Sequence, residues 1–215
     1  MTRAGIGRTR VKICGLTREA DVQAVGELGA DAVGLVFYEH SPRAVGIEQA
    51  CRLLRAVPAF VTTVGLFVDA DPAFVAQVLA RVPLDMLQFH GDEPPAYCGS
   101  FSRPWLKAVR MRPGTNLDAV ADHYSGASAL LLDTFDPTVP GGSGRRFDWD
   151  LVPSSIADRI ILAGGLTPEN VAEAVRRVRP YGVDVSGGVE SAKGLKDRAK
   201  MAAFVQGVRD GDESR

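Results

Sequence analysis

The sequence predicts a (β/α)8 barrel, an α/β fold that would occupy residues 1–215 as a single domain. Strand-like and helix-like segments alternate along all 215 residues, and the eight strand-then-helix units match the number in this barrel. An open, doubly wound sheet gives the same alternation and is the alternative fold. We favour the barrel because no Gly-x-Gly-x-x-Gly sequence follows the first predicted strand.

Eight runs have the apolar or alternating pattern that is typical of strands. They lie at residues 10–14, 32–37, 63–68, 85–90, 105–110, 128–133, 159–162 and 183–186. Amphipathic helices or short helical turns separate them, most clearly at residues 18–28, 47–57, 72–81 and 168–178, and a last helix at 196–208 closes the chain. We expect residues 1–8 and 209–215 to be flexible ends.

Composition and charge narrow the possible classes of protein. The net charge is −1, and no basic stripe indicates a nucleic-acid partner. No apolar run approaches the roughly 20 residues that span a bilayer, and no apolar segment near Met1 indicates a secretory signal. Three widely spaced cysteines predict reduced thiols and a cytoplasmic location. Without an apolar surface stripe, we expect a monomer.

The first strand carries the most informative residues. With period-two alternation, Val11 and Ile13 face one side while Lys12 and Cys14 face the other. Gly15 then ends the strand, which places Cys14 at the carboxyl end of the barrel, where active sites of this fold lie. A free thiol has a pKa of about 8.5, so the cation of Lys12 would favour the thiolate. We predict that Cys14 is a catalytic base and that Lys12 belongs to the same site.

The sixth strand ends in an inward carboxylate. Asp133 follows an otherwise apolar strand and faces the barrel axis, so it is a candidate catalytic acid at the same rim as Cys14. Taken alone, an aspartate at this position more often caps a turn, and it is the pairing with Cys14 that favours catalysis. Gln88 and His90 share one face of the fourth strand; we assign Gln88 to the substrate site and regard His90 as structural or substrate-lining.

Several loops offer groups that bind anions. Arg43 follows the second strand, where its guanidinium could hold a planar carboxylate, although a single surface arginine is common. Gly164 and Gly165 follow the seventh strand, and Ser186-Gly187-Gly188 ends the eighth. Glycine lets backbone N–H groups approach an anion closely, and phosphate sites recur at this pair of strand ends. Tight turns without a ligand are the alternative.

Other polar groups give weaker signals. Gly142 lies in the glycine-rich run 141–144, which could bind an anion or cover the site. Cys51 and Cys98 lie in predicted helices and are interpreted as packing thiols. Because no His/Asp/Glu cluster has metal-ligand spacing, we predict no metal and no cofactor.

These residues occur within motifs that, taken together, resemble the phosphoribosylanthranilate isomerase family of tryptophan biosynthesis over nearly the whole chain. The motifs are VKICGLT (11–17), GLVFY (34–38), SPR (41–43), VGLFV (64–68), QFHGDE (88–93), LLD (131–133), GGSG (141–144), LAGGL (162–166), PENV (168–171) and VDVSGGVE (183–190).

The resemblance implies a cofactor-independent barrel that performs an Amadori rearrangement of N-(5-phosphoribosyl)anthranilate to the 1-deoxyribulose product. It implies that Asp133 is the general acid, that Cys14 is the general base and that Arg43 meets the anthranilate. The glycine loops would hold the phosphate. One departure is Gly187, where the family usually has serine; another is Arg145, where lysine is common.

Two other functions remain open at this point. The related sugar-phosphate isomerase of histidine biosynthesis looks to use an aspartate where this chain has Cys14, and a dual-substrate isomerase would be expected to use two aspartates. A barrel that binds phosphorylated ligands without turnover is the non-enzymatic alternative. The presence of both Cys14 and Asp133 favours the isomerase of tryptophan biosynthesis.

Overall fold

A computed structural model describes residues 7–134 and 147–214. Eight parallel strands form a closed barrel, in which each strand pairs with the next and β8 pairs with β1. The strands are β1 (Arg10–Cys14), β2 (Ala32–Val36), β3 (Thr62–Phe67), β4 (Met86–Phe89), β5 (Trp105–Met111), β6 (Ala129–Thr134), β7 (Ile160–Leu162) and β8 (Gly182–Val185). Closure confirms the predicted barrel and rules out the open sheet.

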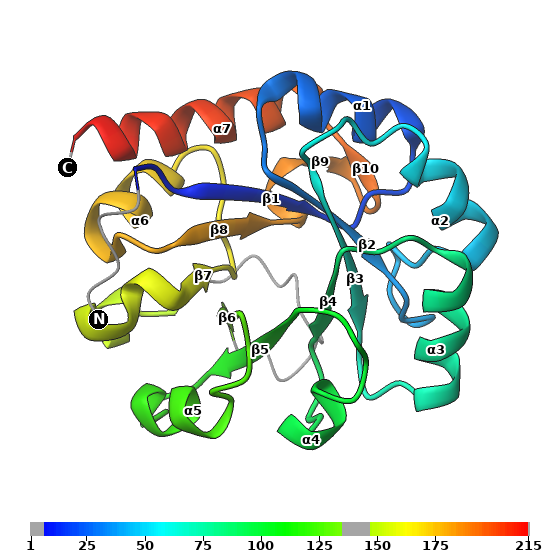
Figure 1. Ribbon diagram of the computed structural model, residues 1–215. Coiled ribbons are helices and arrows are strands. Elements are labelled where there is room, and N and C mark those ends of the chain that lie inside the picture. The colour runs from blue at the N-terminus through cyan, green and yellow to red at the C-terminus, as the bar shows by residue number, and fades with distance from the viewer. Residues whose placement is uncertain (1–6, 135–146, 215) are drawn as a thin grey trace.

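Helices cover the outside of the strands (Figure 1). They are α1 (Glu19–Leu28), α2 (Ile47–Leu54), α3 (Pro72–Arg81), α4 (Pro95–Cys98), α5 (Leu117–His123), α6 (Val171–Val178) and α7 (Arg198–Glu213). Between β6 and β7, the described residues form two 3-10 turns, η1 (Trp149–Leu151) and η2 (Ser154–Arg159), in place of an α-helix. No helix among the described residues is long and apolar enough to cross a membrane.

The strands bury apolar side chains on both faces, as expected for a parallel sheet. The larger cluster lies between strands and helices and includes Leu35, Phe67, Phe89 and Leu132. A smaller cluster fills the barrel itself: Val64, Leu106, Ala108, Ala129, Leu131, Ile161 and Ala163. The inward-facing residues at the carboxyl ends of the strands therefore lie above a packed apolar layer inside the barrel.

Two segments differ from the sequence-based expectation. The last helix continues to Glu213, with Gly211 buried, so residues 209–213 form its last turn rather than a frayed end. The Asp212 carboxylate accepts hydrogen bonds from the backbone N–H and hydroxyl of Thr9, which ties this turn to the start of β1. Arg8 pairs with Asp31, while residues 1–6 lie outside the described part.

A small hairpin follows β8, which the sequence analysis did not anticipate. The 3-10 turn η3 (Gly187–Val189) leads into β9 (Glu190–Ala192), which pairs antiparallel with β10 (Leu195–Lys196). Residue 196, expected to begin the last helix, instead ends β10. The hairpin brings Glu190 and Lys196 close to the carboxyl end of the barrel.

Candidate active site

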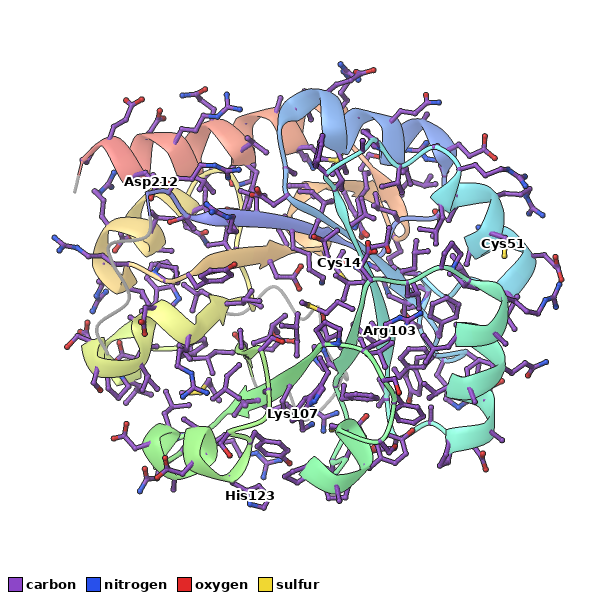
Figure 2. All side chains as sticks on the ribbon, in the orientation of Figure 1. Cys14, Cys51, Arg103, Lys107, His123 and Asp212 are labelled. Carbon is purple, nitrogen blue, oxygen red and sulfur yellow. The ribbon has the colours of Figure 1, made fainter. Side chains whose placement is uncertain are left out.

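A cavity of about 480 Å³ opens at the carboxyl ends of the strands. Nine of the eleven residues predicted for the site line it: Cys14, Arg43, Gln88, Asp133, Gly164, Gly165, Ser186, Gly187 and Gly188. Figure 2 shows Cys14 inside the ring of strands, whereas Cys51 and His123 lie at the outside. Gly142 lies outside the described residues, and Lys12 has a different position.

Lys12 lies one layer deeper than Cys14 in the barrel. Its Nζ pairs with Asp184 Oδ1 at 2.9 Å, and both side chains are buried. Lys12 contributes to a second cavity at the amino ends of the strands, so its place is behind the thiol rather than beside a ligand in the first cavity. A Cβ at Gly34 would come within 2.7 Å of Cys14 Sγ and 3.1 Å of Lys12 Nζ. Glycine on β2 thus leaves room for both groups.

The thiol of Cys14 is not as acidic as the sequence suggested. Burial raises the pKa of the Cys14 thiol above its ordinary value, and the charge of Lys12 offsets this only in part. Asp184 also acts against the thiolate. Lys12 favours the thiolate, as the sequence predicted, but desolvation exceeds the attraction of the cation, so the net shift of the thiol pKa is upward.

Asp133 is held through both carboxylate oxygens. Oδ1 accepts the backbone N–H of Thr134 at 2.8 Å, and Oδ2 lies 3.1 Å from Nε2 of His90. The other ring nitrogen of His90 lies 3.0 Å from Nε2 of Gln88. These side-chain contacts, from Gln88 through His90 to Asp133, hold the carboxylate against the cavity wall. Sequence reasoning placed His90 on the correct face but missed this contact with Asp133.

Arg43 does not extend freely into solvent. Its Nε and Nη2 donate to the two carboxylate oxygens of Glu190 at 2.7 and 2.9 Å. The hydrogen bond that Arg43 donates to Glu190 raises the pKa of Arg43. Burial alone would raise the pKa of Glu190, but hydrogen bonds from Arg43 and Lys196 outweigh it and lower the pKa. Glu190 thus occupies the Nε/Nη2 edge of the guanidinium, and the Nη1/Nη2 edge is the one that could bind a ligand carboxylate.

The glycine loops after β7 and β8 meet in the cavity. Gly164 and Gly165 have φ values of 75° and 65°, a region that side chains disfavour. A Cβ at Gly188 would collide with the carbonyl oxygen of Leu166, so the two loops pack backbone against backbone. This close approach places the glycines of both loops on one wall, where their N–H groups can bind an anion.

The cavity is also lined by polar residues that were not predicted from the sequence. Arg110 lies on the inward face of β5, lines the cavity and donates to the His90 carbonyl oxygen at 3.2 Å. Asp184, Glu190 and Lys193 line the cavity as well. The inward phase of β5 and β8 could have identified Arg110 and Asp184. No group of three His, Cys, Asp or Glu side chains in the described part of the chain could hold a metal ion.

Comparison with known proteins gives a consistent match. The model of the "N-(5'phosphoribosyl)anthranilate (PRA) isomerase" family matches residues 11–207. The chain is 61% identical to the N-(5'-phosphoribosyl)anthranilate isomerase of Thiobacillus denitrificans, over 91% of this chain and 96% of the relative.

Solved structures agree with the sequence match. Phosphoribosyl anthranilate isomerase from Thermotoga maritima superposes with a TM-score of 0.86 at 39% identity, covering 94% of this chain and 98% of that one. A complex of such an isomerase with reduced 1-(o-carboxyphenylamino)-1-deoxyribulose 5-phosphate has a TM-score of 0.82 at 37% identity, with the same coverage. The chain belongs to the phosphoribosylanthranilate isomerase family.

Proposed function

We propose that this chain catalyses the Amadori rearrangement of N-(5-phosphoribosyl)anthranilate with Asp133 as general acid and Cys14 as general base. The chain is an aldose–ketose isomerase of tryptophan biosynthesis, and the reaction is the one its family carries out. The observation that supports the residue roles is that both side chains line one cavity, together with two glycine loops suited to a phosphate.

The first step opens the sugar ring. Asp133 donates a proton to the ring oxygen, the bond between C1′ and that oxygen breaks, and the nitrogen lone pair forms a C1′=N bond. The two hydrogen bonds that Asp133 already makes keep its carboxyl group in one orientation. A positioned acid of this kind accelerates a reaction by roughly 100- to 10,000-fold.

The second step is abstraction of the C2′ proton by the Cys14 thiolate. The electron pair of the C–H bond forms C1′=C2′, and the electrons of the C1′=N bond return to nitrogen, which gives an enolamine. The enol then loses its hydroxyl proton and gains one at C1′ to give the ketone, so atoms and electrons balance. Because the thiol pKa is raised, the thiolate is scarcer at neutral pH but is a stronger base.

The remaining site residues bind the substrate. In this proposal the phosphate binds against Gly164, Gly165 and the turn from Ser186 to Gly188, which all line the cavity. Gln88 lines the same cavity and holds His90 against Asp133. Arg43 meets the anthranilate carboxylate through the part of its guanidinium that Glu190 leaves available. Lys12 supports Cys14 electrostatically, and we keep Gly142 as a proposed substrate-binding residue.

We make two further proposals, about assembly and location. The substrate is a small phosphorylated molecule, the enzyme acts as a monomer in the cytoplasm, and its three cysteines are free thiols. Sedimentation velocity at micromolar concentration tests the monomer, since a dimer would sediment faster at twice the mass.

The activity is tested by steady-state turnover of freshly generated phosphoribosylanthranilate, which is followed through the loss of the substrate's fluorescence. The histidine-pathway aminoaldose substrate is run in parallel. Turnover of the first alone supports the proposal. Turnover of both would indicate a dual-substrate isomerase, and turnover of neither by folded protein would favour a barrel that only binds phosphorylated ligands.

A further inference from the structure

Lys196 is a buried lysine directly behind the loop after β8. Its side chain has no exposed surface. Nζ donates to Glu190 Oε1 at 2.8 Å and to the carbonyl oxygen of Ser186 at 3.0 Å, and lies 3.4 Å from the hydroxyl of Ser186. An ammonium has three donors, so these acceptors account for all of them. Since burying an ammonium is costly, the arrangement calls for a reason beyond packing.

The bond to the Ser186 carbonyl sets the direction of the next N–H. In a trans peptide the C=O and N–H groups point in opposite directions within one plane. With the Ser186 oxygen held toward Lys196, the N–H of Gly187 points to the other side of the loop. Ser186, Gly187 and Gly188 line the cavity, whereas Lys196 is buried behind them. The donor of Gly187 is thereby aimed at the cavity side.

Glu190 connects this lysine to Arg43. One carboxylate oxygen accepts from both Arg43 Nε and Lys196 Nζ. Arg43 Nη2 is the atom that a Cβ on Gly187 would approach, at 3.3 Å. Glu190 therefore holds two cations against the same turn, and its side chain is itself buried. Removal of either cation would change how the turn is held.

We propose that Lys196, anchored by Glu190, is a positioning residue for the substrate phosphate: it orients the Ser186–Gly187 peptide so that the Gly187 N–H faces the anion. Its charge also lies behind that peptide, where it adds to the attraction for a dianion. Lys196 does not touch the phosphate. The inference rests on the proposed placement of the phosphate at the loops after β7 and β8.

Substitution of Lys196 by methionine, compared with Lys200→Met, tests the proposal. Lys200 is a matched control because it donates from α7 to the backbone oxygen of Glu190 at 2.8 Å but makes no bond to Ser186 or to the Glu190 carboxylate. The probe is inorganic phosphate as a competitive inhibitor. We expect Lys196→Met to raise KM and the phosphate inhibition constant about tenfold or more, with kcat changed less and Lys200→Met within about twofold of wild type.

A phosphate inhibition constant that is unchanged in folded Lys196→Met would overturn the proposal. Gly188→Ala separates this failure from a misplaced phosphate, because its Cβ would push the two glycine loops apart. If Gly188→Ala weakens phosphate inhibition and Lys196→Met does not, the phosphate site stands and the role of Lys196 is wrong. If neither variant changes it, the phosphate binds elsewhere.

The pH dependence of phosphate inhibition in Lys196→Arg distinguishes a positioning role from a purely structural one. Burial lowers the pKa of Lys196, opposed by Glu190 and Cys14 and reinforced by Arg43; Asp21 and Arg18 contact its backbone. Phosphate inhibition of the wild type should therefore weaken as the pH becomes alkaline. A guanidinium stays charged, so folded Lys196→Arg should retain inhibition to higher pH. Identical pH profiles for the two proteins would contradict the proposal.

Discussion

Nε2 of His90 lies 3.1 Å from Oδ2 of Asp133, and Nδ1 of the same ring lies 3.0 Å from the amide nitrogen of Gln88. His90 thus connects Gln88 to the proposed acid and holds the carboxyl group of Asp133 in place.

Substitution of His90 by alanine should lower kcat by about tenfold with little change in KM, because the carboxyl group of Asp133 loses one of its two anchors. Asp133→Asn should lower kcat by at least about 100-fold, since it removes the acid itself. Steady-state kinetics distinguish the two. His40→Ala is the control, because His40 is exposed. Equal losses for His90→Ala and Asp133→Asn would give His90 a direct chemical role.

Cys14→Ser should lower kcat by at least about 100-fold, because a serine hydroxyl is a far weaker acid than a thiol and furnishes almost no alkoxide near neutral pH. Serine is nearly isosteric, so the fold should survive, which a thermal melt checks. Cys51→Ser is the matched control, since Cys51 lies in α2 outside the cavity. Wild-type turnover by Cys14→Ser would show that another group is the base.

The pH dependence follows from the direction of the thiol shift. Burial raises the pKa of Cys14, so the neutral thiol is favoured and the thiolate forms only as the pH rises through this raised value. We expect kcat/KM to increase with pH beyond the range of an ordinary thiol. Lys12 acts in the opposite sense, so Lys12→Met should move the increase to still higher pH.

Alkylation measures the same titration without turnover. In a Cys51→Ser/Cys98→Ala background, iodoacetamide reports on Cys14 alone, and Lys12→Met should slow the reaction about tenfold at neutral pH. Asp31→Asn, which removes a carboxylate at the amino end of β2 beside Arg8, should leave the rate unchanged. A pH profile of alkylation that Lys12→Met does not alter would remove Lys12 from the site.

The barrel and most of its site were predictable because their signals are local. The strand period predicted that Cys14 and Asp133 face inward, the ends of their apolar runs placed them at the carboxyl end, and both line the cavity. What could not be predicted depends on pairs that are distant in sequence, such as Arg43 with Glu190, which are 147 residues apart. The raised thiol pKa was missed for a similar reason. Lys12 is only two residues from Cys14 in the sequence, whereas the depth of burial of the thiol follows only from the closed barrel.

The hairpin of β9 and β10 escaped prediction for a different reason. Its strands are three and two residues long, too short for a period to be recognised. Lys196 was therefore predicted to begin the last helix, and its contact with Ser186 could not be inferred. Asp197, the residue that caps α7 by accepting the N–H of Lys200, is the local signal for the true boundary.

Gly164→Ala should damage both stability and turnover. At φ 75° a side chain is strained by about 1–3 kcal/mol, and its Cβ would collide with Thr134 and come within 2.9 Å of Asp133 Oδ1. Gly187→Ser provides the contrast, because the sole atom of the described residues that a Cβ there would approach is Arg43 Nη2, at 3.3 Å. It should fold normally and lower KM by about two- to fivefold through an added hydroxyl donor. Comparable losses of kcat in both variants would contradict this distinction.

A buried ion pair beside the site should contribute strongly to stability. The side chains of Glu93 and Lys107 are 2% and 3% exposed and lie 3.0 Å apart; Glu93 also accepts the N–H groups of Asp69 and Gly91. Lys107→Met would leave a buried carboxylate without its cation, so the free energy of unfolding in urea should fall by about 3–5 kcal/mol. Arg198→Ala breaks an exposed pair with Glu27 and should cost less than about 1 kcal/mol. Similar losses for the two variants would mean that water reaches Glu93 in solution. Lys107 Nζ also donates to the carbonyl oxygen of Gly91 at 2.6 Å, so this substitution would also loosen the turn after β4 that follows His90.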